Sequence, residues 1–128
     1  MKNDVIVGLG ANIQPVENIQ KAIEILRTRF SDIRASRLVK TEPLGFKAQA
    51  PFYNGAVRFE TDLSPEALKQ YLLDIENQLG RVRTENKNGP RTIDLDILVV
   101  NGKITDPDVY ERTFLQQSIR ELAPELIP

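Results

Sequence analysis

Residues 89–100 read GPRTIDLDILVV, and this stretch predicts the strand at the centre of the fold. Its second half is apolar and rich in β-branched residues, and it lies between Pro90 and the pair Asn101-Gly102. An apolar run bounded by turn residues is typical of a buried strand. We therefore place a central strand at residues 91–100.

Two carboxylates, Asp94 and Asp96, lie inside this strand. Side chains alternate between the faces of a strand, so the pair shares one face, with Cα atoms about 6.5 to 7 Å apart. At an effective dielectric near 20, two carboxylates at that distance repel by roughly 2 to 3 kcal/mol. A cation between them would relieve this repulsion. The opposite, buried face is expected to carry Ile93, Leu95, Ile97 and Val99.

A basic loop, residues 81–90, precedes the strand. The loop carries the cations Arg81, Arg83 and Lys87, and Arg91 follows as the first residue of the predicted strand. The aspartates offer acidic oxygens for a hard cation, and the neighbouring basic groups can bind an anion. This combination suits magnesium and a polyphosphate. The alternative is a solvated surface on which the aspartates pair with Arg81 or Arg91 and form no site.

Composition limits the class of protein. The 128 residues predict one domain, residues 1–128, with a single core. A net charge of −1 provides no global field for nucleic-acid binding. No apolar run approaches the ~18 residues of a membrane span, and the N-terminus has no signal-peptide pattern. We therefore expect a cytoplasmic protein without nucleic-acid or membrane partners; its oligomeric state is not indicated.

The chain contains neither cysteine nor histidine. Disulfides, thiolate nucleophiles, imidazole catalysis and zinc sites with cysteine or histidine ligands are thereby excluded. Any chemistry must use carboxylates, arginine, lysine, tyrosine, hydroxyl groups and the main chain.

Hydrophobic periodicity predicts the remaining elements. Strands are expected at residues 5–9, 33–40, 52–61 and 103–105, and helices at residues 15–30, 65–79 and 115–123. Gly8 and Gly10 follow the first apolar run without a third glycine at dinucleotide-binding spacing, so they indicate a tight turn rather than a phosphate cradle. The element order predicts a ferredoxin-like α+β fold, βαββαβ, with both helices on one face of an antiparallel sheet, followed by a hairpin strand and a helix.

Residues 41–51, TEPLGFKAQAP, have no period and form a loop, which either binds a ligand or covers the sheet edge. Phe52, Asn54 and Phe114 offer two aromatic rings and an amide for a flat heterocycle, although such residues also serve as core packing. The fold by itself assigns no function.

The assembled motifs resemble the 6-hydroxymethyl-7,8-dihydropterin pyrophosphokinase family. The matching pieces, in family order, are GLGAN, TEPLG, QAPFYN, LGRVR, GPRTIDLDIL, RTFL and ELAPEL. The resemblance implies transfer of the β,γ-diphosphate of ATP to a hydroxymethyl-dihydropterin in folate biosynthesis, with two magnesium ions. Such phosphoryl-type transfer needs positioning and charge neutralisation more than covalent help, so it suits a chain without histidine or cysteine.

The resemblance also implies residue roles. Asp94 and Asp96 would hold the metal ions, and with Arg81 and Arg91 they form the catalytic set. ATP would contact Glu76, Arg83, Arg91, the main chain of Ile97, and Arg112. The pterin would lie among Thr41, Pro43, Leu44, Phe52, Asn54 and Phe114.

Two departures from the family pattern keep alternatives open. Asn88 stands where many relatives have an aromatic residue. Asp106-Pro107-Asp108 stands near the position of a Pro-His segment whose histidine reaches the ATP phosphates in relatives. The first alternative is therefore a pterin- or nucleotide-binding relative with little turnover. The second is an interaction module whose charges only pair with one another.

Overall fold

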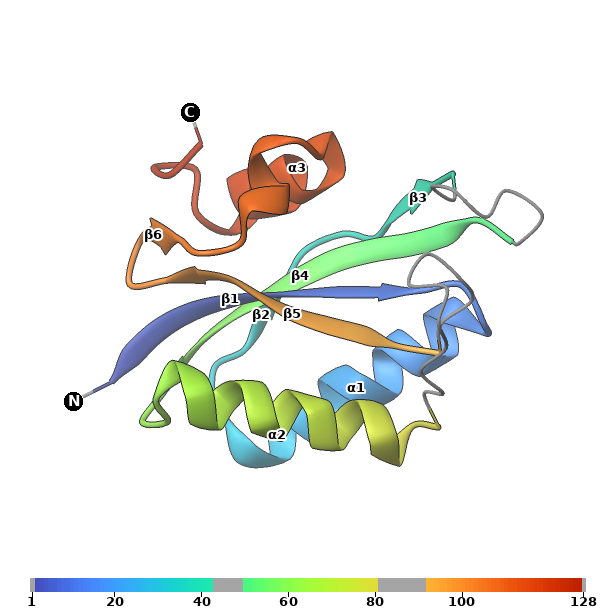
Figure 1. Ribbon diagram of the computed structural model, residues 1–128, viewed down its shortest axis with the longest axis horizontal. Helices are drawn as coiled ribbons and strands as arrows, with labels where there is room; N and C mark the ends of the chain where they lie inside the picture. The colour runs from blue at the N-terminus through green and yellow to red at the C-terminus, as the bar shows by residue number, and fades with distance from the viewer. Residues whose placement is uncertain (1, 43–49, 81–91, 128) are drawn as a thin grey trace.

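The computed structural model describes residues 2–42, 50–80 and 92–127. Within them, six strands form one sheet, with α1 and α2 on one face and α3 on the other (Figure 1). The strands are β1 (Asn3–Ala11), β2 (Arg34–Ala35), β3 (Val39–Thr41), β4 (Phe52–Thr61), β5 (Asp94–Val100) and β6 (Lys103–Ile104). The helices are α1 (Pro15–Arg29), α2 (Pro65–Gln78), the short 3₁₀ helix η1 (Pro107–Tyr110) and α3 (Thr113–Leu122). No helix in the described ranges is long and apolar enough to cross a bilayer.

The sheet confirms the predicted ferredoxin-like α+β topology. Its strand order is β2-β4-β1-β5-β6, with β3 also paired to β4, and every pairing is antiparallel. Helix α1 follows β1 and α2 follows β4, so each connects strands that are not neighbours in the sheet. This is the split βαβ arrangement that the order of sequence patterns predicted.

The two long helices begin and end where the sequence signals indicate. Pro15 and Pro65 each occupy a first helical position, where the missing N–H costs nothing. The Ser64 hydroxyl accepts a hydrogen bond from the N–H of Ala67, which caps α2. Gly80 follows α2 with a φ of 84°, a left-handed conformation that glycine adopts without strain.

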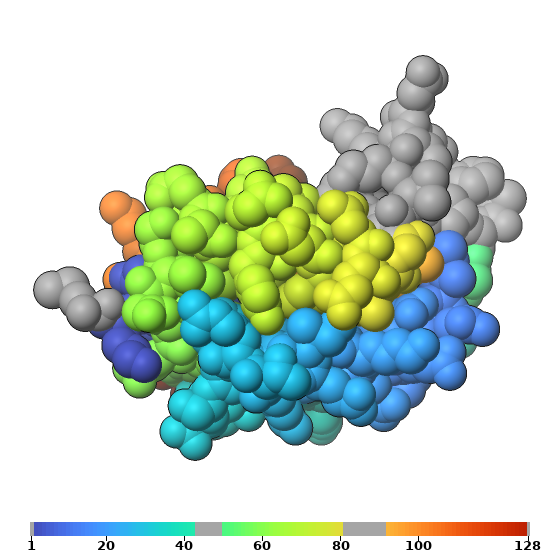
Figure 2. Space-filling model, turned by 90° about the horizontal axis from the view of Figure 1, so that it is seen from below, coloured from blue at the N-terminus to red at the C-terminus, as the bar shows by residue number. Residues whose placement is uncertain are grey.

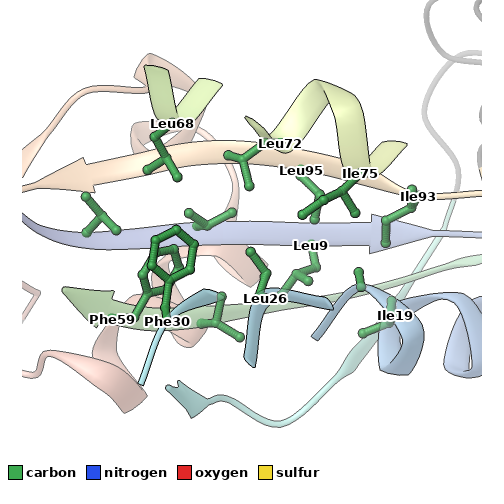
Figure 3. Packing of buried hydrophobic residues seen from close by; sticks show 14 of the residues in the cluster. Leu9, Ile19, Leu26, Phe30, Phe59, Leu68, Leu72, Ile75, Ile93 and Leu95 are labelled. Carbon is green, nitrogen blue, oxygen red and sulfur yellow. The ribbon is translucent and has the colours of Figure 1, made fainter. Parts of the chain in front are cut away.

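The main core lies between the sheet and the helix pair. Helices α1 and α2 lie side by side over this face (Figure 2). Their stripes of buried residues meet the sheet in one cluster, with Phe30 stacked on Phe59 at 4.5 Å between ring centroids (Figure 3). The labelled members of this cluster are Leu9, Ile19, Leu26, Phe30, Phe59, Leu68, Leu72, Ile75, Ile93 and Leu95.

A second core lies on the opposite face of the sheet, beneath α3. Ile6, Ala56, Leu98, Val99, Val109, Ile119, Leu122 and Ala123 are its buried members. Helix α3 and η1 cover only part of this face, and the cavity described below lies on the same face.

Strand β5 contains an irregularity that corrects one prediction. Val7 pairs with Ile97 and Ile6 pairs with Val99, which leaves Leu98 as an extra residue. Such a bulge shifts the side-chain alternation by one position. The prediction that Val99 faces the helix pair with Ile97 was therefore wrong: Val99 packs in the second core, and Val100 packs against the first.

The strand predicted at residues 33–40 was also wrong in part, because the structure divides it into β2 and β3. Ser36 donates its N–H to the carbonyl of Ala56, and its hydroxyl accepts from the N–H of the same residue. The chain then passes close to Gly55, where an added Cβ would lie 2.8 Å from Leu38 Cδ2. The Ser36 hydroxyl thus takes the place of a main-chain acceptor in the pairing with β4, and the strand is interrupted at this residue.

Candidate active site

A cavity of about 380 Å³ opens on the second face of the sheet, beside η1 and the first turn of α3. This volume is typical of small-molecule sites. Its lining residues are Gly8, Leu9, Gly10, Thr41, Glu42, Phe52, Asn54, Asp94, Asp96, Leu98, Asp106, Asp108, Arg112, Phe114 and Leu115.

Gly8 and Gly10 form part of the cavity floor, and the predicted turn at these residues was wrong. Strand β1 continues through both to Ala11. A Cβ on Gly10 would lie 2.7 Å from Asn54 Oδ1, and one on Gly8 would lie 3.1 Å from Leu98 Cδ1. Glycine within a strand often marks such close approach. Gly8 and Gly10 are two residues apart, so in a strand both lie on the same face. This spacing was the signal in the sequence that could have predicted a continuous strand.

One end of the cavity carries the aromatic and amide side chains. Phe52 and Asn54 project from β4 on the same face, and Phe114 comes from the first turn of α3. Thr41 at the end of β3 accepts a hydrogen bond of 2.8 Å at its hydroxyl from Asn54 Nδ2. The structure therefore brings together four of the residues that the resemblance connects with a pterin.

The other end is acidic. Asp94 and Asp96 of β5 lie opposite Gly10 and Gly8 of β1, so no side chain from β1 crowds either carboxylate. Asp106 lies directly before η1, and its carboxylate accepts a hydrogen bond from the N–H of Asp108. Asp106 and Asp108 depart from the family pattern in sequence, but the sequence did not predict that both would line the same cavity as Asp94 and Asp96.

Burial is the largest cause that raises the pKa of Asp96 from 3.8 to about 7, and the negative charges of Asp94, Asp106 and Glu76 contribute to the same rise. The side chain is open to water inside a concave site, while the surrounding protein atoms reduce its hydration. An ionised Asp96 is therefore disfavoured unless a cation compensates its charge.

This donor set fits magnesium. Magnesium commonly takes one or two protein carboxylates and completes its shell with water and substrate phosphates. Among residues 2–42, 50–80 and 92–127, no group of three or more candidate ligands is preformed around one metal position. Asp94 and Asp96 lie on one face, and the pKa of Asp96 is raised. These two features are consistent with a metal ion that binds together with a polyphosphate.

Arg112 is the cationic side chain among the described residues that line the cavity. It precedes α3, and its Nε lies 3.9 Å from Asp108 Oδ2. An ion pair this long and partly exposed holds the side chain weakly. The guanidinium can therefore turn toward a phosphate in the cavity.

Glu76 and Ile97 lie along the outer edge of β5. Glu76 is buried on α2 and accepts a hydrogen bond of 2.7 Å from the N–H of Leu95. That N–H therefore points away from β1, and by strand alternation the main-chain groups of Ile97 point the same way. Within the described ranges, strand β6 pairs with Val99 and Val100 and does not reach Ile97. The main-chain groups of Ile97 are thus directed away from β1, and their contact with adenine remains a prediction from the resemblance.

Several predicted site residues lie outside the described residues. They are Pro43, Leu44, Arg81, Arg83, Lys87, Asn88 and Arg91. Their assignments remain predictions from the sequence.

Comparison with known proteins agrees with the motifs. Residues 6–124 match the model of the family described as 7,8-dihydro-6-hydroxymethylpterin-pyrophosphokinase. The 2-amino-4-hydroxy-6-hydroxymethyldihydropteridine pyrophosphokinase of Bacillus subtilis is 34% identical over 98% of this chain and 81% of its own length. The enzyme of the same name from Haemophilus influenzae is 34% identical over 94% of this chain and 82% of its own length.

A longer relative shows the same region as part of a larger protein. The folate synthesis bifunctional protein of Arabidopsis thaliana is 32% identical over 93% of this chain, which covers 27% of that protein. The family model spans nearly all of the chain, and the bacterial relatives align with most of their own length. The chain therefore belongs to the 7,8-dihydro-6-hydroxymethylpterin-pyrophosphokinase family.

Proposed function

We propose that this protein transfers a diphosphate group from ATP to 6-hydroxymethyl-7,8-dihydropterin, as a step of folate biosynthesis in the cytoplasm. The hydroxymethyl oxygen forms a bond to the β-phosphorus, the bond from that phosphorus to the α-phosphate oxygen breaks, and AMP leaves. The hydroxyl proton passes to solvent. The observation that carries the proposal is one cavity with an aromatic and amide end beside a dicarboxylate end.

The pterin occupies the end lined by Phe52 and Phe114, which enclose its ring, while Asn54 presents amide groups to its polar edge. The hydrogen bond from Asn54 to Thr41 supports this role because it holds the amide in one orientation over Gly10. Burial of a flat ring between two aromatic side chains favours stacking and adds specificity through a small number of polar contacts. Pro43 and Leu44 complete this assignment from the resemblance.

Asp94 and Asp96 hold magnesium, with two ions expected. When bound, magnesium neutralises phosphate charge and lowers the barrier for displacement at phosphorus. A bound cation would also offset the burial and the negative neighbouring charges that raise the pKa of Asp96. The contribution of the chain is to fix two carboxylates on one rigid strand, opposite glycines that leave room for the phosphates.

ATP lies along the outer edge of β5. The main chain of Ile97 offers hydrogen bonds to the adenine, Glu76 lies at the same edge, and Arg112 reaches the phosphates. Arg81, Arg83 and Arg91 supply further phosphate contacts, and Arg91 stabilises charge in the transition state.

A second candidate, a pterin- or nucleotide-binding relative with little turnover, is favoured by Asp106 and Asp108. Both carboxylates line the cavity at the acidic end, where they oppose binding of a polyphosphate. This candidate keeps the pterin contacts and loses only the reaction.

The decisive experiment measures AMP and pterin diphosphate formed from ATP and 6-hydroxymethyl-7,8-dihydropterin, with magnesium and then with a chelator. Equal amounts of both products, abolished by the chelator, support the transferase. Pterin binding in a fluorescence titration, without AMP formation at any magnesium concentration, supports the second candidate.

A further inference from the structure

Arg58 stands outside the cavity and joins three parts of the fold. It projects from β4 on the face that also carries Phe52 and Asn54. Its guanidinium contacts Asp4 of β1 through two hydrogen bonds, Nε to Oδ1 at 3.1 Å and Nη2 to Oδ2 at 2.7 Å. Nη1 donates to the carbonyl oxygen of Leu122 at 2.9 Å. The Arg58 side chain is 22% exposed and that of Asp4 is 37% exposed, so the pair is partly shielded from water.

The carbonyl of Leu122 belongs to the last residue of α3. The final carbonyls of a helix lack partners within the helix, and they carry the negative end of its dipole. Arg58 meets that carbonyl, and Arg34 of β2 donates to the same oxygen at 3.3 Å. Glu125, three residues after the end of the helix, has its Oε2 atom 3.6 Å from Arg58 Nη1. Two cations from neighbouring strands therefore hold the C-terminal end of α3.

The opposite end of α3 carries a wall of the cavity. Phe114 lies in the first turn of the helix and faces the same cavity as Phe52. Between the two ends, Ile119 of α3 packs with Ala56 of β4 in the second core. The ten residues of α3 span about 15 Å as a rigid rod, so a shift at one end moves the other.

We propose that Arg58 is a positioning residue that fixes α3 on β4 and thereby sets the gap between Phe52 and Phe114. The inference rests on the proposed function, because that gap is the pterin slot. The hydrogen bond to Asp4 raises the pKa of Arg58 above its ordinary value, so the guanidinium is charged at neutral pH.

The chain offers a matched control. Arg37 also contacts α3, with its Nε 3.3 Å from Glu121 Oε1, but its side chain is 90% exposed. Exposed pairs of this kind add little to stability. Replacing Arg37 thus removes an arginine contact to the same helix without removing the shielded anchor.

The experiment compares Arg58→Met, Arg58→Lys and Arg37→Met with the wild-type protein, and uses Phe114→Ala as the benchmark for a lost wall. Kinetic constants for pterin and ATP are measured well below the melting temperature of each variant. Pterin affinity is measured separately by fluorescence titration. We expect Arg58→Met to raise the pterin KM and Kd about tenfold, because a displaced Phe114 loses its stacking contact with the ring. The ATP KM should change less than about twofold, because Arg58 is not among the residues that line the cavity and its replacement leaves the charges that line it in place.

Arg58→Lys should recover part of the pterin affinity, because an ammonium group can bond the Leu122 carbonyl but cannot bind Asp4 through two parallel bonds. Arg37→Met should match the wild type. A lower melting temperature for Arg58→Met with unchanged pterin Kd would overturn the proposal, and so would equal losses for ATP and pterin. If Arg58→Met does not fold, Asp4→Asn and Arg58→Lys provide the same comparison. Should the wild type bind pterin without turnover, the proposed reaction fails, while the pterin Kd still tests Arg58.

Discussion

The carboxylate of Glu76 accepts a hydrogen bond of 2.7 Å from the main-chain N–H of Leu95, the residue between Asp94 and Asp96. Glu76 is 1% exposed, so a helix residue is joined to the edge of β5 inside the core. The contact holds the strand at the position from which both aspartates enter the cavity. It also places a third carboxylate close enough to raise the pKa of Asp96.

Two replacements of Glu76 distinguish the effect of its hydrogen bond to Leu95 from the effect of its negative charge. Glu76→Gln keeps an acceptor for Leu95, so its magnesium requirement for AMP formation should stay within about threefold of the wild type. Glu76→Met leaves that buried N–H without an acceptor, which costs about 1 to 3 kcal/mol of stability, and it should raise the magnesium requirement. Urea denaturation and magnesium titrations of the reaction measure both effects. If the two variants had the same stability and the same magnesium requirement, the hydrogen bond to Leu95 would not be what positions the strand.

Asp94→Asn and Asp96→Asn should each lower turnover by at least about a hundredfold, the scale of losing one group that stabilises charge in a transition state. Pterin affinity in the absence of magnesium should remain, because the aromatic end is intact. The control is Asp62→Asn, which changes an exposed pair with Arg29. Full activity in either cavity variant contradicts the metal assignment.

The raised pKa of Asp96 makes a prediction about stability and pH. The folded state holds a proton on Asp96 up to about pH 7, whereas the unfolded state releases it near 3.8. The ionised carboxylate therefore destabilises the ligand-free protein, a cost that is absent below the lower value and complete above the higher one. Glu76, Asp94 and Asp106 are the other carboxylates that contribute to it.

Asp96→Asn should accordingly be more stable than the wild type at about pH 8, by about 1 kcal/mol after allowance for solvent screening. Near pH 4 the two proteins should have equal free energies of unfolding. Urea denaturation without metal at both pH values makes the comparison, and added magnesium should stabilise only the wild type. A constant difference across the pH range would show that Asp96 titrates normally.

Gly10 and Gly8 allow a paired test of the cavity floor. An added Cβ at Gly10 meets the amide oxygen of Asn54 at 2.7 Å, whereas one at Gly8 meets only the flexible end of Leu98 at 3.1 Å. Gly10→Ala should weaken pterin binding by about tenfold or more through displacement of the amide, given that one lost or misplaced hydrogen bond is worth about 1 kcal/mol or more. Gly8→Ala should change the pterin Kd less. Fluorescence titrations of the two variants decide whether the contact at Gly10 matters.

The sequence predicted the element order and the shared face of Asp94 and Asp96 because these depend on local period and turn residues. It did not predict the bulge at Leu98, since extra residues in a strand are set by pairing with a partner that is distant in the chain. The break at Ser36 has the same origin: a hydroxyl replaces a ladder partner on β4.

The glycines of β1 show a different limit. A glycine pair after an apolar run resembles a turn when only neighbours in sequence are considered. The reason for Gly10 is the side chain of Asn54, which reaches it from the neighbouring strand. Motifs could thus predict the aspartate pair and the aromatic and amide side chains that line the cavity, whereas its floor and the carboxylates of Asp106 and Asp108 depend on tertiary contact.

The position of α3 also bears on how the protein matures during translation. Strands β1, β4 and β5 leave the ribosome before α3, and until the helix docks, their second face exposes Ile6, Ala56 and Leu98. A bare apolar patch on an incomplete sheet is prone to self-association. Docking of α3 therefore removes an aggregation hazard and completes the wall of the cavity in a single event.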